Sequence, residues 1–338
     1  MLHGEAALAK LAKADGVHLR AGSDAGVARA QIGHGRLLGA SVHTITEAAA
    51  VDPEVADYVL AGPAFETDSK PGYGPEIGRK GLGEIAHAAR VPVLVWKGGM
   101  TEAGARATFS HTGSLATPSA VWKAAMRQGG AVEVINFDAM LDALELITRA
   151  RFPVKGRRMG LVAMTGGQSV VISDAFARYG LEVPALSQKS YDEFATFFQV
   201  IGGSYRNPLD ASWTMGPRGD VNAADRVLDI LDRDPVIDAI VMEFRPGPGF
   251  GGPPRAEFKD EDMIPPIERL ARFNQRASKP FAIAMEAGHT HPDMDAATIV
   301  KFMQFSRERG LVTLEGFERA AAAFATAAEC YESRARVH

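Results

Sequence analysis

One histidine stands among small residues in a stretch that follows an apolar run. His111 is followed by Thr112, Gly113 and Ser114, just before a helical pattern that starts near Leu115. Small side chains let a phosphate group approach backbone N–H groups, and the positive end of a helix dipole attracts an anion. The stretch therefore predicts a phosphoryl-carrying imidazole, with the next three residues as its phosphate-binding site. The alternative is a histidine that only caps a helix or fills a loop.

A second glycine-containing turn follows an apolar strand pattern over 159–164. It consists of Thr165 followed by Gly166, Gly167, Gln168 and Ser169, and a helical pattern continues from it. Glycines at a strand-to-helix turn let an anion reach the first N–H groups of the helix, which have no partner within the helix. The last four of these residues are therefore candidate phosphate-binding residues. Glycines serve packing alone at many turns of this kind.

A third group of polar residues lies in a loop bounded by glycine and proline. Thr67, Ser69 and Lys70 supply two hydroxyls and an ammonium after a strand pattern, and such groups suit an anion. They form a second candidate phosphate site. The alternative, which we favour, is a surface loop without this role.

Composition restricts the class of protein. A chain of 338 residues with 46% apolar residues is long enough for about two domains with ordinary buried cores. The net charge of −4 and the lack of a dense Lys/Arg block argue against a nucleic acid or a membrane surface as partner. A single cysteine, Cys330, fits a reducing cytoplasm. His289, His291 and Asp293 lack a recognised ligand pattern, so we expect no metal site.

Apolar runs and helical patterns alternate along the chain, which is typical of parallel α/β folds. The expected strands lie at 15–19, 37–42, 57–60, 91–96 and 131–135 in the first part, and at 159–164, 239–244, 281–285 and 311–314 in the second. A basic segment with proline and glycine at 151–158 reads as the linker between them.

The stretch around His111 resembles a known family. Lys97-Gly-Gly, Gly104-Ala-Arg and Ser110-His-Thr-Gly-Ser-Leu-Ala are similar to the phosphohistidine segment of the NDP-forming acyl-CoA synthetases, which include ADP-forming acetate–CoA ligase and succinyl-CoA synthetase. The resemblance covers about residues 91–335. It implies that His111 takes a phosphoryl group from an acyl phosphate and passes it to ADP. It also implies that the turn at 166–169 is a second helix N-terminus facing the same phosphoryl group.

The same resemblance implies partners and cofactors. CoA and ATP or ADP with Mg²⁺ belong to the family's reaction, but its CoA-binding and ATP-grasp domains have no counterpart in this sequence, so we expect no tightly bound cofactor. An ATP-grasp β subunit or domain is the expected partner, a small carboxylic acid and its acyl-CoA are the expected substrates, and an oligomer is expected. The family's glutamate that orients the phosphohistidine cannot be assigned.

The first part resembles a different family. Ala14-Asp-Gly-Val-His-Leu19, Leu38 to Thr44 and Ala56 to Pro63 are similar to the middle of a thiamine phosphate synthase or thiazole tautomerase barrel, over about residues 7–95. The resemblance implies phosphate contacts for Thr67, Ser69 and Lys70. Only about four of eight barrel strands are represented, which argues against synthase activity.

These resemblances lead to one fold prediction. We expect two flavodoxin-like (succinyl-CoA synthetase-like) parallel three-layer α/β domains, the first completed by a partial TIM-barrel-like segment. The segments are 1–95 (partial barrel), 96–152 (phosphohistidine-bearing part) and 159–335 (second ligase domain).

Two classes of function remain open at this point. In the first class, the chain is a component of an ADP-forming acyl-CoA synthetase that acts with a partner subunit. Alternatively, it is a catalytically incomplete protein that binds a phosphate ligand, or a fusion related to thiamine phosphate synthase.

Overall fold

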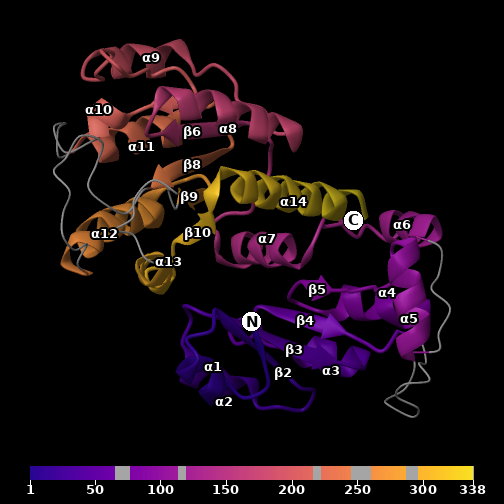
Figure 1. The fold of residues 1–338 in the computed structure, drawn as a ribbon. Coiled ribbons are helices and arrows are strands. Elements are labelled where there is room, and N and C mark those ends of the chain that lie inside the picture. The colour runs from indigo at the N-terminus through magenta and orange to yellow at the C-terminus, as the bar shows by residue number, and fades with distance from the viewer. Residues whose placement is uncertain (65–76, 113–118, 216–221, 245–259, 287–295, 338) are drawn as a thin grey trace. The chain divides into compact units, whose positions relative to one another are not determined.

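The computed structural model describes residues 1–64, 77–112, 119–215, 222–244, 260–286 and 296–337. The chain divides into two compact units, Met1–Glu133 and Val134–His338. Each unit contains a five-stranded parallel sheet (Figure 1). The prediction of two parallel α/β domains is therefore confirmed.

The first unit has its strands in sequential order, β1-β2-β3-β4-β5. The strands are β1 (Leu2–His3), β2 (Gly16–Leu19), β3 (Leu37–Val42), β4 (Tyr58–Ala61) and β5 (Val93–Leu94). The helices that alternate with them are α1 (Ala6–Leu11), α2 (Ala25–Ile32), α3 (Ile45–Ala50) and α4 (Gly78–Ala88). A sequential parallel order is that of consecutive strand–helix pairs in a barrel, so the unit has the order of a partial barrel.

The two faces of this sheet differ in chemistry. Val17, Leu38 and Val59 lie on one face and pack with α1 to α4 in two apolar clusters. Because side chains alternate along a strand, their neighbours His18, Gly39 and Tyr58 share the opposite face. The first face is the core of the unit, and the second carries polar and aromatic groups.

The fifth strand of this sheet is not the expected one. We predicted a strand at 131–135, but no strand lies there, and Ile135 is 80% exposed. Leu2 instead pairs with Val17 and adds β1 at the other edge of the sheet. The segment 131–135 leads into α7 (Phe137–Arg149), whose first turn is capped by Asn136. Half-buried Val132 and Val134 and exposed Ile135, which precede a helix cap, thus imitate a strand pattern.

The second unit has the strand order β10-β9-β8-β6-β7. Its strands are β6 (Met159–Ala163), β7 (Leu209–Asp210), β8 (Ala239–Phe244), β9 (Phe281–Met285) and β10 (Val312–Glu315). Its helices, besides α7, are α8 (Gly166–Arg178), α9 (Gln188–Ala195), α10 (Ser212–Met215), α11 (Ala223–Arg233), α12 (Asp260–Arg276), α13 (Ala296–Glu308) and α14 (Gly316–Val337). The first strand of the unit lies inside the sheet, between the second and the third, which is the flavodoxin-like order.

Helices cover both faces of this sheet, which makes three layers. Leu161, Val241 and Leu314 face a cluster formed with α8 and α14. Val162 and Ile240, one position away, face a cluster formed with α9, α11, α12 and α13. Strands buried on both faces are expected to be mostly apolar, and these strands are, with Glu243 of β8 as a buried exception.

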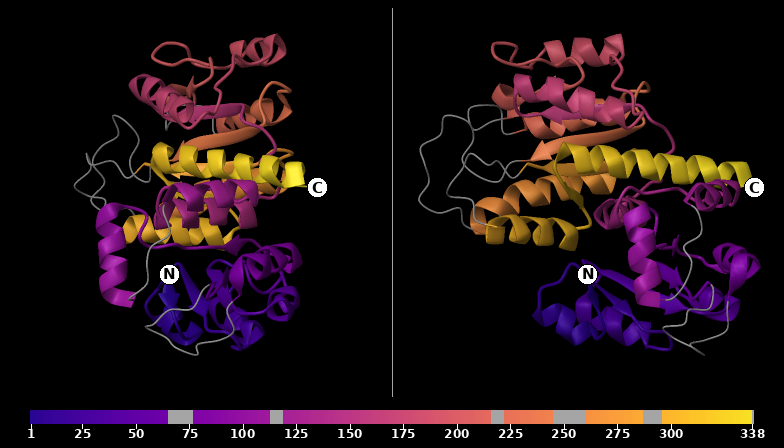
Figure 2. Two further views of the ribbon diagram at one scale, coloured as in Figure 1. Left: turned by 90° about the vertical axis from the view of Figure 1, so that its right-hand side faces the viewer. Right: turned by 45° about the vertical axis from the view of Figure 1, so that its right-hand side comes forward.

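Helix α7 belongs to the second unit, which moves the division of the chain upstream of the predicted linker at 151–158. Figures 1 and 2 show α7 beside α14. Asp142 forms a bidentate ion pair with Arg319 (2.6 and 2.7 Å), and Glu145 forms one with Arg307 (2.9 and 2.8 Å). The basic residues of the expected linker are themselves paired, as in the Arg157–Glu332 contact of 2.8 Å. Ion pairs therefore attach this segment to the second unit, and its charge does not mark a flexible connection.

Candidate functional site

The turn between β6 and α8 is the best-defined candidate site. Thr165 is the N-cap of α8, in an extended conformation, and its hydroxyl accepts a hydrogen bond from Gln168 N–H (3.3 Å). A threonine followed three residues later by glutamine is a common way to begin a helix. The chain thus leaves the buried strand β6 and begins α8 within a few residues.

Two of the four predicted residues of this turn present unused donors. The first N–H groups of a helix have no carbonyl partner within it, and here these belong to Gly166 and Gly167. A Cβ at Gly167 would meet nothing within 4 Å, so an approaching group has room. Two N–H groups at the positive end of a thirteen-residue helix can hold one anionic oxygen.

The other two predicted residues have their polar groups engaged within the helix. Gln168 N–H is used by the cap, and Ser169 N–H donates to Thr165 O (3.1 Å). The Ser169 hydroxyl also donates to Thr165 O (3.1 Å). Their contribution to the turn is therefore to fix its geometry.

Asp210, at the end of β7, reaches the same turn. Its carboxylate Oδ1 accepts hydrogen bonds from Ser212 Oγ (3.0 Å) and Ser212 N–H (3.4 Å). Its Oδ2 lies 3.0 Å from the place where a Cβ on Gly166 would be, so a side chain at that position would crowd the carboxylate. Asp210 is only 7% exposed. This contact explains why the first helical residue is glycine.

A second buried carboxylate holds the strand end before the turn. Glu243 on β8 is fully buried, and its Oε2 accepts a hydrogen bond from Met164 N–H (2.6 Å). Strand β6 lies between β7 and β8, where the strand order reverses, and ligands of open α/β sheets bind at such points. Asp210 and Glu243 therefore reach the turn from the two strands that flank β6.

Asn207 joins this part of the sheet together. Its side-chain NH₂ donates to Met159 O (2.7 Å) and Pro184 O (2.9 Å), and its Oδ1 accepts from Leu161 N–H (2.9 Å). The segment Asn207 to Asp210 thus attaches the short edge strand β7 beside β6. Asn207 therefore has a structural role: it holds the framework of the site together.

In the first unit, His111 and Thr112 are the last two residues of α5 (Glu102–Thr112). We expected His111 in a loop before a helix, so this placement is a correction. The helix begins because Thr101 Oγ1 accepts from Gly104 N–H (3.0 Å), and an Arg106–Glu102 ion pair (2.9 Å) spans its first turns. The C-terminal end of a helix carries partial negative charge, so α5 itself does not favour a phosphoryl group there.

Several predicted residues fall outside the described residues. These are Thr67, Ser69 and Lys70 of the second candidate phosphate site, Gly113 and Ser114 after the histidine, and the group His289, His291 and Asp293. The helix that we expected to start near Leu115 corresponds to α6, which the structure describes as Ser119–Gln128. None of the residues of α6 is buried. The roles proposed for the first-unit residues therefore remain predictions.

A row of ring side chains on the first sheet was not foreseen. His3, His18 and Tyr58 occupy one line across β1 to β4, with Gly39 between the last two. The His18 ring lies within hydrogen-bond distance of Tyr58 OH (3.1 Å, from Nδ1) and Ser41 Oγ (3.0 Å, from Nε2). The tyrosine ring fits because position 39 is glycine: a Cβ there would be 2.1 Å from Cζ. An imidazole between two hydroxyls can relay a proton.

Burial shifts the ionisation of this row. The pKa of His18 is lowered, first by desolvation and then by the charge of His3. The pKa of Tyr58 is raised, chiefly by desolvation and also by Asp57. Both shifts favour the neutral forms, and a neutral His18 ring can share one hydrogen bond with Tyr58 OH and another with Ser41 Oγ.

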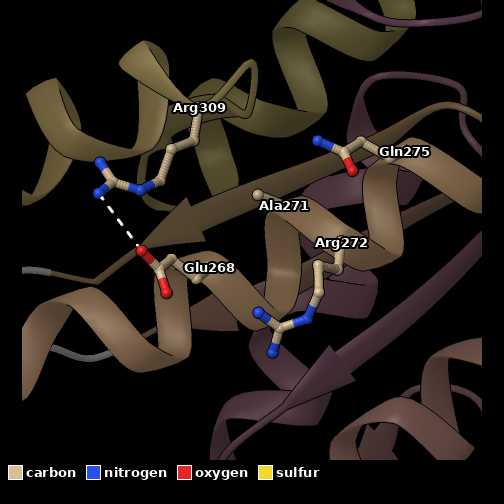
Figure 3. A pocket seen from close by; sticks show the side chains of 5 residues that line it. All are labelled: Glu268, Ala271, Arg272, Gln275 and Arg309. Atoms are coloured by element: carbon tan, nitrogen blue, oxygen red, sulfur yellow. Dashed lines mark ion pairs between the residues drawn. The ribbon is translucent and has the colours of Figure 1, made fainter.

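A shallow groove of about 270 Å³ lies elsewhere in the second unit (Figure 3). It is lined by Glu268, Ala271, Arg272 and Gln275 of α12 and by Arg309, which follows α13. Arg309 and Glu268 are 3.7 Å apart, so one of its positive charges is partly compensated. No residue of the α8 turn lines it.

Within the described ranges, no group of three or more His, Cys, Asp or Glu side chains is arranged to hold a metal ion. Among the helices that the structure describes, none combines the length and apolar character needed to cross a bilayer.

The beginning of the chain is similar to thiamine phosphate synthases. Residues 1–120 match the family model of thiamine monophosphate synthase. The thiamine-phosphate synthase of Roseiflexus castenholzii is 46% identical over 95 residues, which are 27% of this chain and 40% of that protein. The predicted resemblance of the first part is therefore confirmed.

Other relatives are ligases. The α subunit of the ADP-forming acetate–CoA ligase II of Pyrococcus furiosus is 29% identical over 150 residues, which are 44% of this chain and 31% of that subunit. The dinucleotide-forming acetyl-coenzyme A synthetase 1 of Ca. Korarchaeum cryptofilum has a similar fold, with a TM-score of 0.62 and 20% identity over 85% of this chain and 55% of that one. This chain spans about a third of the ligase subunit. It joins a segment similar to thiamine phosphate synthases to a part similar to ADP-forming acyl-CoA ligases, among them an α subunit.

Proposed function

We propose that the chain is a component of an ADP-forming acyl-CoA ligase and that His111 carries the phosphoryl group. The similarity to ligase α subunits supports this class of reaction. The observation that carries the proposal furthest is the α8 turn, where Gly166 and Gly167 present two N–H groups to an anion. The exchange involves acid, CoA and ATP on one side and acyl-CoA, ADP and phosphate on the other.

The role of His111 follows from what a phosphoryl carrier must do. An imidazole nitrogen attacks the phosphorus of an acyl phosphate, the bond from phosphorus to the acyl oxygen breaks, and the carboxylate leaves. ADP then attacks the same phosphorus and releases the imidazole. Charge in such transition states lies on the peripheral oxygens, so N–H donors and positioning provide most of the catalysis. Because α5 presents its negative end at His111, α5 itself does not supply those donors.

Partner and cofactors extend this proposal. The relative named as an α subunit implies a partner subunit, and we propose that it is an ATP-grasp subunit or domain that supplies ATP or ADP with Mg²⁺. The turn fits a phosphoryl oxygen, with two N–H donors and open space above Gly167. CoA and a small carboxylic acid complete the reaction, and we place the protein in a reducing cytoplasm, where Cys330 stays a thiol.

The test is transfer of a radiolabel from ATP in the presence of a candidate ATP-grasp subunit. Wild type should take an acid-labile, base-stable label, and His111→Asn should abolish it while changing the free energy of unfolding by no more than about 1 kcal/mol. His34→Asn, an exposed histidine in the first unit, is the matched control and should keep the label. Ser169→Ala should only weaken it, because the Gly166 and Gly167 donors remain.

One result would transfer the function to the other candidate site. If the label survives in His111→Asn but disappears in Lys70→Ala, the phosphate chemistry belongs to the thiamine phosphate synthase-like segment. No label with any partner would leave a protein that binds a phosphate ligand without transferring it.

A further inference from the structure

Three side chains of the first sheet form a line from one hydroxyl, through an imidazole, to a second hydroxyl. Ser41 Oγ lies 3.0 Å from Nε2 of His18, and Tyr58 OH lies 3.1 Å from Nδ1 of the same ring. The serine is on β3, the histidine on β2 and the tyrosine on β4. A serine beside a histidine that a third group orients is the arrangement that activates a hydroxyl as a nucleophile.

The imidazole in this line is held by rings on both sides. The His18 and Tyr58 rings have centroids 5.6 Å apart and planes 26° apart, and His3 on β1 stacks on His18 at 5.7 Å and 21°. Tyr58 is 4% exposed, and its ring fits over Gly39, where a Cβ would be 2.1 Å from Cζ. The neighbouring rings therefore keep both nitrogen atoms of His18 directed at the two hydroxyls.

The protonation of the line suits a base at its centre. Desolvation lowers the pKa of His18, and the charge of His3 lowers it further, so the ring is uncharged near neutral pH. Desolvation raises the pKa of Tyr58, so its hydroxyl keeps its proton. Alcohol and phenol groups can each donate or accept a hydrogen bond. When Nδ1 donates its proton to the Tyr58 oxygen, the lone pair of Nε2 faces the Ser41 hydroxyl.

The serine end of the line is accessible and has apolar neighbours. Ser41 and His18 are half-buried, so part of each side chain can be reached from solvent. Leu60 pairs with Ser41 across the sheet, Leu94 pairs with Leu60, and both leucines are half-buried. Paired residues of neighbouring strands share a face, so the two leucines lie in one row with the serine. A short acyl chain on this row would bring its carbonyl carbon to Ser41 Oγ.

We propose that Ser41 is a nucleophile that accepts acyl groups from short-chain acyl esters or thioesters. This activity goes beyond the proposed function, because neither His111 nor the α8 turn takes part in it. Ser41 Oγ bonds to the acyl carbon while its proton passes to His18 Nε2. The bond from the acyl carbon to the leaving oxygen or sulfur breaks, and the leaving atom takes the proton from Nε2.

Hydrolysis of the acyl-enzyme repeats these steps with water. Water gives a proton to His18 Nε2 and attacks the acyl carbon, and Ser41 Oγ leaves with that proton, which releases the carboxylic acid. Tyr58 touches neither the acyl group nor the leaving group in this scheme. It is a positioning residue, because it acts on the reaction only through the tautomer and orientation of His18.

The covalent acyl-enzyme is the species to look for. Esterases stabilise the oxyanion with preorganised donors, and one such donor contributes a factor of about 10² to 10³ in rate. Ser41 lies on β3, between β2 and β4, so its own N–H points along the sheet and not to the face where the acyl group would lie. We therefore expect slow turnover with a stable adduct.

The experiment treats the full chain with p-nitrophenyl acetate or with acetyl-CoA. Release of nitrophenol or of the thiol is followed, and peptide mass spectrometry locates the acetyl group. Wild type should give a burst equal to the amount of protein and carry the acetyl group on Ser41. Ser41→Ala should lose both, and Ser41→Cys, which keeps a nucleophile, should regain the adduct. His18→Gln should slow acylation at least about a hundredfold. The two substrates distinguish oxygen from sulfur leaving groups.

A variant of Tyr58 separates positioning from packing. Tyr58→Phe keeps the ring over Gly39 and removes only the hydroxyl. It should lower the acylation rate at saturating ester about fivefold, the worth of one neutral hydrogen bond, and leave the half-saturating concentration unchanged. Ser23→Ala and His34→Asn, at two exposed positions of the first unit, are the controls and should react as wild type does.

Three results would overturn the inference. They are the absence of an adduct in wild type with either substrate, an acetyl group found only at residues other than Ser41, and an undiminished burst in Ser41→Ala. Mapping of the wild-type adduct decides the matter even if a variant does not fold. Failure here would leave the labelling of His111 unaffected, and loss of that label would leave acylation of Ser41 standing.

Discussion

The ion pair between Glu145 and Arg307 offers the sharpest test of how the second unit is held together. Glu145 is 5% exposed and Arg307 is 13% exposed, and two contacts of 2.9 and 2.8 Å join them. Glu145 also accepts from the N–H of Thr313 on the edge strand β10 (3.5 Å). Helix α7 thereby covers an edge that would otherwise be open to pairing with another chain.

Glu145→Ala should be strongly destabilising. Removing one partner of a buried ion pair leaves the other charge uncompensated, which costs about 3 to 5 kcal/mol. For a unit of this size, about 2 to 4 °C accompanies each kcal/mol, so the transition should fall by about 6 to 20 °C. The control is Glu193→Ala, which removes a pair with Arg233 at 2.9 Å whose side chains are 36% and 60% exposed. Solvent screens such a pair, so its loss should cost less than about 1 kcal/mol.

Thermal unfolding should be followed by the fluorescence of Trp213 in a background where Trp96 and Trp122 are phenylalanine. Trp213 belongs to the second unit and the other two to the first, so the signal reports the unit that contains α7. If Glu145→Ala lowers the transition no more than Glu193→Ala does, the pair does not anchor α7. A double substitution, Glu145→Leu with Arg307→Met, should recover most of the loss, because apolar replacement of a buried pair is often neutral.

Two further predictions concern the limits of the units and the acid sensitivity of the first. A fragment 134–338 should fold on its own. A fragment 159–338, which starts after the linker expected from the sequence, should be unstable because it lacks the buried face of α7. Urea unfolding of the two fragments tests this difference. The pKa of His18 is lowered below 6.5 in the fold, so the unfolded chain binds the proton more readily and the first unit should lose stability as the pH falls below 6.5. The slope cannot exceed about 1.4 kcal/mol per pH unit, and His18→Gln should flatten it; an unchanged acid slope in that variant would contradict the role of burial.

Strands with several apolar residues were predictable from the sequence. The strands at 37–42, 239–244 and 281–285 have the predicted limits, because continuous runs of buried residues leave few alternatives. Strands β1 and β7 were not predicted as strands, since two residues carry no periodicity and both are defined only by their neighbours in the sheet. Helix α5 was missed because the small residues around His111 suggested a loop, although the Thr101 cap was readable.

The site was predictable only where its residues are adjacent in sequence. The glycines after β6 marked the turn because strand, turn and helix follow one another directly. Asp210 reaches that turn only because Leu209 pairs with Val162 across the sheet, a register that sequence patterns do not contain. Glu243 left one readable signal, a single charge inside the apolar run 239–244. A carboxylate in a strand buried on both faces requires a hydrogen-bond partner, and here that is Met164 N–H.

The different strand orders of the two units also set how each one folds. In the first unit every strand pairs with the next one along the chain, as Val17 does with Leu38, so its contacts are local. In the second unit the strand β6 pairs through Met159 with Ala239, so a long loop must close before its central contact forms. Domains rich in local contacts fold faster. During synthesis, the first unit should therefore complete its sheet before β8, the partner of β6, has left the ribosome.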